Sequence, residues 1–359
     1  MDTVDLRSDT LTKPTKRMRE AMFNAEVGDD VFLEDPTVKI LEEKAAEMVG
    51  MEAAIFVSCG SMGNLIAIMN HCDTRGCEAY CGSGSHCLLH EQCGAAQLGG
   101  VNLRPLQNNS DGTFNLCELE SKLRKDRDHE PISKLVIIEN TTDGKIVPQS
   151  WIEELVIFCK KYNLKLHMDG ARLWNASVGS GKSAKDIVTG CDSVTFCLSK
   201  GLGAPVGSVL CGNKEFVIKA RRVRKVLGGG MRQVGILAAA GLVALEDTIP
   251  ILKYDHKRAF LLASSINEIQ SSVFSVDLTA VQTNMVFVEV NTNVTTARMF
   301  ANRLREIHND TEEDTIIVKC LALNDSIVRF VLYHEITDAQ IELAIRKIKY
   351  VISKFNSKN

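Results

Sequence analysis

Apolar positions along the chain recur with two spacings, and this pattern predicts alternating helices and strands. Between the Asp35-Pro36-Thr37 step and Gly50, apolar residues return every third or fourth position, which predicts a helix. Residues 54–57 then form a short apolar run typical of a buried strand. A serine- and glycine-rich turn at 58–64 leads into a second helical pattern. Residues 1–30 before these elements predict an extended arm and a short helix.

The middle of the chain predicts a strand, a helix and another strand in that order. Residues 135–138 form a continuous apolar run, and Ser150-x-x-Glu153 predicts a capping box that starts a helix through Tyr162. Residues 164–168 predict the next strand. Two further apolar runs, at 193–198 and 208–210, extend the same sheet. This order predicts a right-handed parallel unit, and therefore an α/β fold with a mostly parallel central sheet flanked by helices.

The pattern changes around Asp247-Thr248-Ile249-Pro250. Beyond this point, predicted strands at 285–290, 316–323 and 327–332 alternate with helices, and the last helix starts at the capping box Thr337-x-x-Gln340. We therefore predict three parts: an N-terminal arm and short helix at 1–30, a large α/β domain at 31–247 and a small C-terminal α+β domain at 248–359.

Charge and composition exclude several kinds of partner. With 42 basic and 45 acidic residues the formal charge is −3, so no strong field attracts nucleic acid or an anionic membrane. The first residues lack a basic start followed by an apolar run, and no uninterrupted apolar stretch approaches the roughly 20 residues of a membrane helix. We expect a cytoplasmic protein without nucleic-acid or membrane partners.

The cysteines are expected to be reduced and structural. Most of the 12 lie within apolar strand or helix patterns. Five of them cluster between Cys72 and Cys93, but none forms the pair with a two-residue gap that a zinc knuckle needs. We predict no metal site.

An acid and a lysine follow two of the predicted parallel strands, and this pairing suits a pyridoxal phosphate site. Burial of Lys200 at a strand end favours its neutral amine, which can form a Schiff base with an aldehyde. Asp169 would pair with the pyridine nitrogen and keep it protonated. For an isolated lysine, a side chain that reaches solvent from a strand end is the competing explanation. The glycine-rich segment 201–205 favours the cofactor, because its small residues leave room for a planar ring.

Other residues are consistent with such a site, although each has a simpler explanation. Arg172 offers a fork of donors for a substrate carboxylate, or forms a surface pair with Asp169. Gly60 and Ser61 lie at the positive end of a predicted helix, where they suit a phosphate or serve only as a cap. His86 begins a predicted helix and would stack on a ring or move a proton, unless it is merely solvated.

Three further motifs carry less weight. The loop 178–183 lacks the first glycine and the preceding strand of a nucleotide-binding loop, and 201–207 misses the dinucleotide spacing by one residue. The basic helix at 214–225 is typical of a solvated face. Its alternative role is a subunit contact that directs Arg232 or Lys225 toward the phosphate of a neighbouring subunit.

Several unusual segments resemble the low-specificity L-threonine aldolases, which are fold type I pyridoxal phosphate enzymes. The resemblance covers nearly the whole chain and rests on six segments: Val4-Asp5-Leu6-Arg7-Ser8-Asp9-Thr10, Glu26 to Val31, Glu34-Asp35-Pro36-Thr37, His167 to Arg172, Leu198 to Gly207, and Leu227 to Gln233. It implies cleavage of L-threonine or L-allo-threonine to glycine and an aldehyde. It also implies a homotetramer whose active sites are shared between subunits.

The resemblance implies a role for each matching residue. Lys200 carries the cofactor, Asp169 holds the ring nitrogen and His86 stacks on the ring. The phosphate is held by Gly60, Ser61, Ser199 and the Arg232 of a neighbouring subunit. The carboxylate of the amino-acid substrate is held by Ser8, Arg172 and Arg329.

The chain departs from the family pattern where the base is expected. The family reads Glu-Asn-Thr-His-Asn, whereas this chain reads Glu139-Asn140-Thr141-Thr142-Asp143, so Thr142 replaces a histidine that contacts the substrate hydroxyl. Two alternatives therefore stay open at this stage. One is another pyridoxal phosphate reaction such as β-elimination, and the other is a cofactor-binding protein with reduced turnover.

Overall fold

The computed structural model describes residues 2–308 and 311–356. Contacts divide the chain into two compact units. The large unit comprises Lys13–Thr142 and Ile146–Ile249, and the small unit comprises the residues up to Thr12, Asp143–Lys145 and the chain from Pro250 onward. The domains predicted at 1–30, 31–247 and 248–359 stay a prediction, because a unit defined by contacts is not by itself a folding domain.

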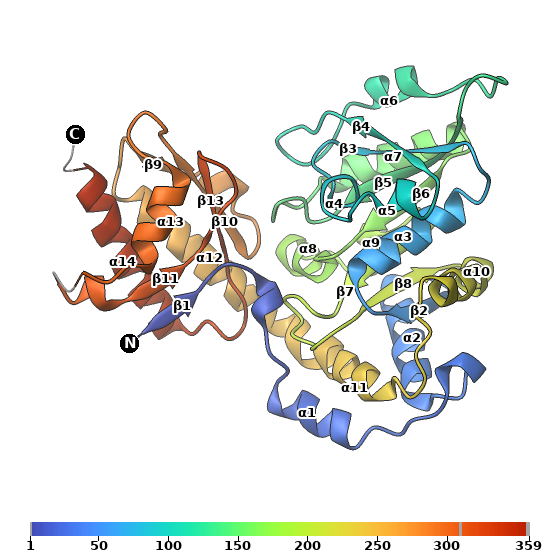
Figure 1. The fold of residues 1–359 in the computed structure, drawn as a ribbon, viewed down its shortest axis with the longest axis horizontal. Helices are drawn as coiled ribbons and strands as arrows, with labels where there is room; N and C mark the ends of the chain where they lie inside the picture. The colour runs from blue at the N-terminus through green and yellow to red at the C-terminus, as the bar shows by residue number, and fades with distance from the viewer. Residues whose placement is uncertain (1, 309–310, 357–359) are drawn as a thin grey trace. The chain divides into compact units, whose positions relative to one another are not determined.

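The large unit is built on a seven-stranded sheet with the order β2-β8-β7-β6-β5-β3-β4 (Figure 1). The strands are β2 (Ala53–Val57), β3 (Cys77–Gly82), β4 (Asn102–Leu106), β5 (Ile132–Glu139), β6 (Lys165–Asp169), β7 (Ser193–Cys197) and β8 (Ser208–Gly212). Neighbours from β4 to β7 are parallel, whereas β8 is antiparallel to both β7 and β2. It follows that β2 runs in the same direction as β7. The carboxyl ends of every strand but β8 therefore meet at one edge.

The helices of the large unit pack on this sheet or on one another. They are α1 (Lys16–Phe23), α2 (Pro36–Val49), α3 (Gly60–His71), α4 (His86–Leu89), α5 (Gly94–Gln97), α6 (Leu116–Lys122), α7 (Gln149–Lys161), α8 (Leu173–Ser180), α9 (Ala184–Ile187), α10 (Lys214–Val226) and α11 (Gly235–Val243). Helix α3 packs across β6, β7 and β8. Its Ile66 and Ala67 are buried with Leu210 of β8 and Phe216 of α10. The sheet and α3 together form the support on which the site is built.

Local signals set the bounds of α2, as the sequence predicts. Oδ1 of Asp35 accepts a hydrogen bond from the amide of Val38 at 3.1 Å, and Pro36 occupies the first turn. Gly50 ends the helix with φ of 67°, a left-handed conformation that glycine adopts without steric cost.

The predicted capping box of the helix near residue 150 is wrong. Helix α7 begins at Gln149, so Ser150 lies inside its first turn. The residue before the helix is Pro148, with φ of −56° and no hydrogen bond from a side chain to the helix start within the described residues. The fixed φ of proline favours a helix start at this point without help from a serine.

The expectation of a solvated basic helix is wrong for part of α10. Arg224 is 3% exposed, and its guanidinium donates to Oδ2 of Asp30 at 2.5 Å and to the carbonyl of Phe56 at 2.7 Å. Arg221 donates to Glu42, whose pKa burial raises to about 7 against the opposing charge of Arg221. The sequence did not reveal these pairings, because each partner lies more than a hundred residues away.

No disulfide joins cysteines in the described part of the chain. Four of the five clustered cysteines, Cys72, Cys77, Cys81 and Cys87, are buried in an apolar cluster formed with α3, α5 and β5. Burial raises the pKa of the Cys72 thiol to about 12, so this group stays protonated at neutral pH. These residues behave as small apolar side chains.

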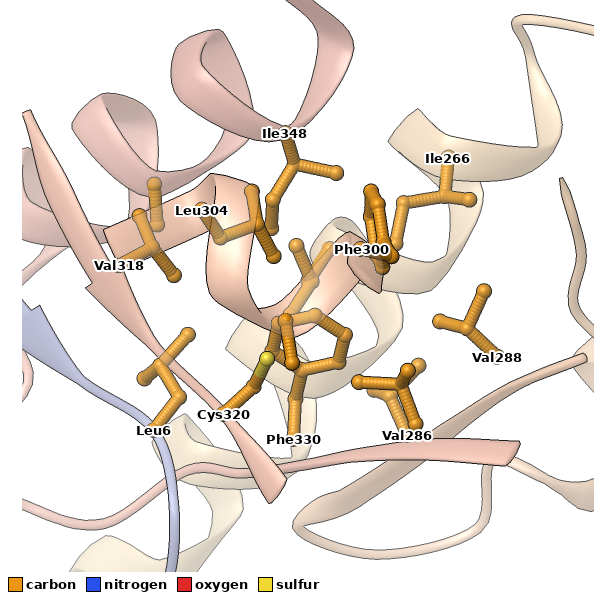
Figure 2. Packing of buried hydrophobic residues seen from close by; sticks show 14 of the residues in the cluster. Leu6, Ile266, Val286, Val288, Phe300, Leu304, Val318, Cys320, Phe330 and Ile348 are labelled. Carbon is orange, nitrogen blue, oxygen red and sulfur yellow. The ribbon is translucent and has the colours of Figure 1, made fainter. Parts of the chain in front are cut away.

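The small unit carries its own core. Its strands are β1 (Thr3–Asp5), β9 (Phe274–Ser275), β10 (Met285–Val290), β11 (Ile317–Lys319), β12 (Leu321–Ala322) and β13 (Ile327–Val331), and its helices are α12 (Leu252–Asn267), α13 (Ala297–Arg305) and α14 (Asp338–Asn356). Figure 2 shows side chains from these elements converging, with Phe300 and Leu304 of α13 above Phe330 of β13. The strand predicted at 316–323 is two short strands, because β11 pairs with β1 and β12 pairs with β13.

By length and composition, one helical run in the described residues, Gly235–Asn267, could cross a membrane. In its most apolar window, 56% of the residues are buried inside the protein. Core helices of folded proteins pass the same test, so this run is weak evidence for a membrane segment.

Candidate active site

Four segments that the sequence singled out end at the same edge of the large sheet. Gly60 and Ser61 follow β2, His86 follows β3, Asp169 ends β6, and Lys200 follows β7 by three residues. The topology therefore gathers a glycine-serine turn, an imidazole, a carboxylate and an amine in one region. Open α/β sheets bind their ligands outside the carboxyl ends of the strands.

Asp169 is held by hydrogen-bond donors on both sides of its carboxylate. The residue is 5% exposed. Its Oδ2 accepts from Nδ2 of Asn64 at 2.7 Å, and its Oδ1 accepts from the amide of Ala171 at 2.9 Å. These two hydrogen bonds fix the orientation of the carboxylate.

His86 is anchored at the start of α4 by two acidic side chains. Its backbone amide donates to Glu139, and its Nδ1 lies 2.8 Å from Oε1 of Glu91. The imidazole is 45% exposed, whereas the Glu91 side chain is 6% exposed. One ligand atom each of His86, Glu91 and Asp169 lie within 4.8 Å of one another. Two acids and a histidine at this spacing suit a small cation as well as an organic cofactor, but an acidic cluster alone identifies neither.

Lys200 and Arg172 lie close enough to Cys197 to influence its titration. Burial raises the pKa of the Cys197 thiol, the positive charges of Lys200 and Arg172 oppose this rise, and the charge of Asp169 adds to it. Cys197 ends β7, between the Asp169 strand and β8. The charges of the amine, the guanidinium and the carboxylate therefore all act on the thiol at the end of β7.

The first turn of α3 fits a phosphate. The residue before the helix is Cys59, and no side chain in the described residues caps the free amides of this turn. A Cβ at Gly60 would lie 2.9 Å from Sγ of Cys197, so the helix start lies directly against the end of β7. A Cβ at Gly63 would lie 2.6 Å from Cγ2 of Thr195. Free amides at the positive end of a helix, beside the hydroxyl of Ser61, are the donors that a phosphate needs.

Arg232, predicted to reach a neighbouring subunit, pairs within its own chain. Its Nη1 lies 2.9 Å from Oδ2 of Asp29, and its side chain is 53% exposed. Ser199, predicted to help with the phosphate, is half-buried next to Lys200. The roles of both residues toward a phosphate stay predictions.

Two of the residues predicted to bind the substrate carboxylate belong to the small unit. Nη2 of Arg329 donates to the carbonyl of Arg7 at 3.2 Å, which places the guanidinium beside the Arg7-Ser8 segment. Oγ of Ser8 accepts from the amide of Thr10 at 3.2 Å. Ser8 and Arg329 are thus neighbours within this unit, and their role toward a substrate stays a prediction.

Thr142, at the position where the family has histidine, is turned toward the backbone. Its Oγ1 donates to the carbonyl of Glu139 at 3.2 Å. A Cβ at Gly112 would lie 2.8 Å from Cβ of Thr142, so these two residues are in close contact. Unlike a histidine side chain, the hydroxyl of Thr142 does not ionise near neutral pH.

Residues 5–292 match the model of the beta-eliminating lyase family. The chain belongs to that family. Low-specificity L-threonine aldolase 1 of Arabidopsis thaliana is 44% identical over 350 residues, which cover 96% of this chain and 95% of the relative. The low specificity L-threonine aldolase of Escherichia coli (strain K12) is 46% identical over 287 residues, covering 80% of this chain and 84% of the relative.

Solved structures confirm the predicted fold class of this beta-eliminating lyase. The threonine aldolase of Leishmania major superposes with a TM-score of 0.79 at 20% identity, covering 97% of this chain and 99% of the other. At this identity the likeness shows the fold, which is the fold type I architecture with a mostly parallel central sheet and a smaller C-terminal sheet.

The sequence prediction missed two residues that contact the candidate site, Asn64 and Glu91. The side-chain amide of Asn64 links Asp169 to Glu91. Its Nδ2 donates to Oδ2 of Asp169 at 2.7 Å and to Oε1 of Glu91 at 3.0 Å. Asn64 is 2% exposed on a helix whose neighbouring residues are largely apolar. A polar residue on an apolar face was the available signal, because a buried amide requires partners.

Proposed function

We propose that this chain is a pyridoxal phosphate-dependent lyase that cleaves L-threonine and L-allo-threonine to glycine and an aldehyde. The observation that carries the proposal is its 44% identity to a curated low-specificity L-threonine aldolase over nearly the full length of both proteins. The placement of Asp169 at the end of β6 and of Lys200 just after the neighbouring parallel strand β7 supports it. When bound, pyridoxal phosphate supplies an aldehyde that captures the substrate amine and a ring that withdraws electrons from Cα.

Each predicted site residue would have its own task in this reaction. Lys200 provides the amine that tethers the cofactor, and Asp169 holds a proton on the ring nitrogen. The first turn of α3, with Gly60 and Ser61, binds the phosphate. His86, whose imidazole Glu91 keeps in a fixed orientation, would stack on the ring.

The substrate carboxylate fits the guanidinium of Arg172, whose fork of donors matches two carboxylate oxygens at once. Binding in this way would orient the amino acid for cleavage of the bond between Cα and Cβ. Cleavage then requires a base for the β-hydroxyl proton. We favour this cleavage over β-elimination, because the curated relatives at 44% and 46% identity are named aldolases.

We further propose that the protein acts in the cytoplasm as a homotetramer, with Arg232 of one subunit reaching the phosphate site of the next. Exposed apolar side chains support association, among them Phe32, Leu98 and Val226, which are 68%, 56% and 75% exposed. Sedimentation of the cofactor-loaded protein tests the tetramer, and a monomer at micromolar concentration would contradict it.

The activity is tested by incubating cofactor-loaded protein with L-threonine and with L-allo-threonine, and measuring glycine and acetaldehyde. We expect both products in equal amounts, and we expect Lys200→Ala to abolish them. Lys182→Ala removes an exposed lysine and serves as the matched control. Absence of both products, or formation of pyruvate and ammonia from L-serine instead, would overturn the proposal.

A further inference from the structure

A continuous chain of side-chain hydrogen bonds runs from His71 to Asp169 through the interior of the large unit. We call it the Asn64 chain, and it consists of His71, Ser193, His167, Asn64 and Asp169. Oγ of Ser193 lies 2.8 Å from Nε2 of His71 and 2.8 Å from Nδ1 of His167. Nε2 of His167 lies 3.2 Å from Oδ1 of Asn64, whose Nδ2 lies 2.7 Å from Asp169.

Two carboxylates fix the orientation of the Asn64 amide. Its nitrogen faces Oδ2 of Asp169 and Oε1 of Glu91, and a carboxylate only accepts hydrogen bonds. The amide oxygen must therefore face His167. Since that oxygen also only accepts, Nε2 of His167 must carry a proton and donate it.

Burial of the two imidazoles determines where the other protons of the Asn64 chain lie. It lowers the pKa of His167 and that of His71 to about 3, so both imidazoles are neutral and each has a single N–H. Nδ1 of His167 is consequently an acceptor, and the hydroxyl of Ser193 donates to it. Because Ser193 has only one proton, its oxygen accepts from Nε2 of His71. Every donor in the chain therefore points toward Asp169.

We infer that the Asn64 chain is a positioning device that holds the Asp169 carboxylate in the orientation needed to meet the ring nitrogen of the cofactor. The inference rests on the proposed function. Hydrogen bonds aligned in one direction polarise one another, so each link adds to the donor strength of the next. Asn64 also ties this device to His86, because the same amide binds Glu91, which binds the imidazole.

The His71 end of the Asn64 chain lies away from the edge of the sheet at which the cofactor would bind. His71 lines a cavity of about 280 Å³ together with Lys165 and Asp192. His167 and Ser193 face each other across β6 and β7, where β7 begins. The chain thus runs along the two central strands from the start of β7 to the carboxyl end of β6, which is a route that only side chains on one face of the sheet can provide.

Two substitutions interrupt the Asn64 chain of hydrogen bonds at different points, and neither adds a charge. Asn64→Leu removes both donors to the carboxylates, and Ser193→Ala removes the link between the two imidazoles. Asn70→Leu is the matched control, because Asn70 is a buried asparagine on the same helix whose Nδ2 donates to the carbonyl of Phe216 at 3.0 Å. The readouts are the dissociation constant of pyridoxal phosphate and the pH midpoint of the absorbance of the bound cofactor.

The ionisable groups near Asp169, or near the Cys197 thiol that its charge influences, are His86, Glu91, His167, Lys200, Arg172 and Cys197 itself, and none of these variants removes one. A shift in the pH midpoint therefore reports the hydrogen bonds themselves. We expect Asn64→Leu to weaken cofactor binding about tenfold or more and Ser193→Ala about threefold, each with a shifted midpoint. We expect Asn70→Leu to leave both readouts within twofold of the wild type.

Cofactor binding and glycine formation by the wild-type protein distinguish failure of this inference from failure of the proposed function. If the wild-type protein binds the cofactor and forms glycine, while folded Ser193→Ala has the wild-type affinity and pH midpoint, the inference is overturned and the function stands. If the wild-type protein neither binds the cofactor nor forms glycine, the proposed function fails first. Should Asn64→Leu not fold, Ser193→Ala alone decides, because alanine fits a site in which Ser193 is fully buried.

Discussion

Oε1 of Glu91 lies 2.8 Å from Nδ1 of His86 and fixes the tautomer of that imidazole. A carboxylate can only accept, so Nδ1 carries the proton and Nε2 is the nitrogen left for other work. Glu91 is nearly buried and is held in turn by Asn64. This is the arrangement by which a carboxylate orients a histidine that acts as a base.

We predict that His86 both covers the cofactor ring and moves the β-hydroxyl proton, and two variants separate these roles. His86→Phe keeps a ring for stacking but loses both nitrogens, so cofactor affinity should stay within about threefold while threonine cleavage falls at least about 100-fold. His86→Ala should lose affinity as well. Cofactor titration and glycine formation measure the two effects, and wild-type turnover in His86→Phe would show that the imidazole moves no proton.

Replacing Thr142 with the histidine of the family pattern should change the rate of threonine cleavage little. Thr142 faces the carbonyl of Glu139, and His86 with its Glu91 partner already supplies an oriented imidazole. We therefore expect Thr142→His to raise kcat/KM for L-threonine no more than about threefold, with Thr142→Asn as a control of similar size. A gain of about 100-fold, which is the range of a newly supplied general base, would mean that this chain is catalytically reduced.

Local signals explain which elements the sequence predicted correctly. Asp35, Pro36 and Gly50 act on their own neighbours, and α2 begins and ends where they indicate. Thr337 and Gln340 likewise form the predicted reciprocal cap, with amide to side-chain distances of 3.0 and 3.2 Å. The break between β11 and β12 was missed, because it depends on which strands pair with each half, and pairing partners are not written in the local pattern.

The same distinction applies to the site. Lys200 and Asp169 were predicted because each follows a strand, and parallel strands end at a shared edge whatever their order. Asn64 and Glu91 were missed because their roles arise from contacts across 105 and 27 residues of sequence. The burial of Asn64 follows from the packing of α3 on the sheet, which the local sequence pattern does not specify.

A buried acid in the small unit provides a test of stability against pH. Asp255 in α12 is 1% exposed, and neither carboxylate oxygen has a hydrogen-bond partner among residues 2–308 and 311–356. Burial raises its pKa from 3.8 to about 7, Arg258 at 3.6 Å opposes this rise, and the charge of Asp9 adds to it. The folded protein therefore binds a proton between about pH 4 and 7 that the unfolded chain has released.

Because the folded pKa lies above the unfolded value, Asp255 lowers the free energy of unfolding as pH rises through this window. We expect Asp255→Asn to match the wild type near pH 4 and to exceed it at pH 8 by about 2 kcal/mol, below an upper limit of about 4 kcal/mol for a three-unit shift. Urea unfolding at both pH values measures the difference. Asp338→Asn, which removes the 82% exposed partner of the same Arg258, should show no such trend. An equal gap between Asp255→Asn and the wild type at the two pH values would mean that Asp255 is ionised in the folded protein throughout, because only a proton taken up on folding makes the gap grow with pH.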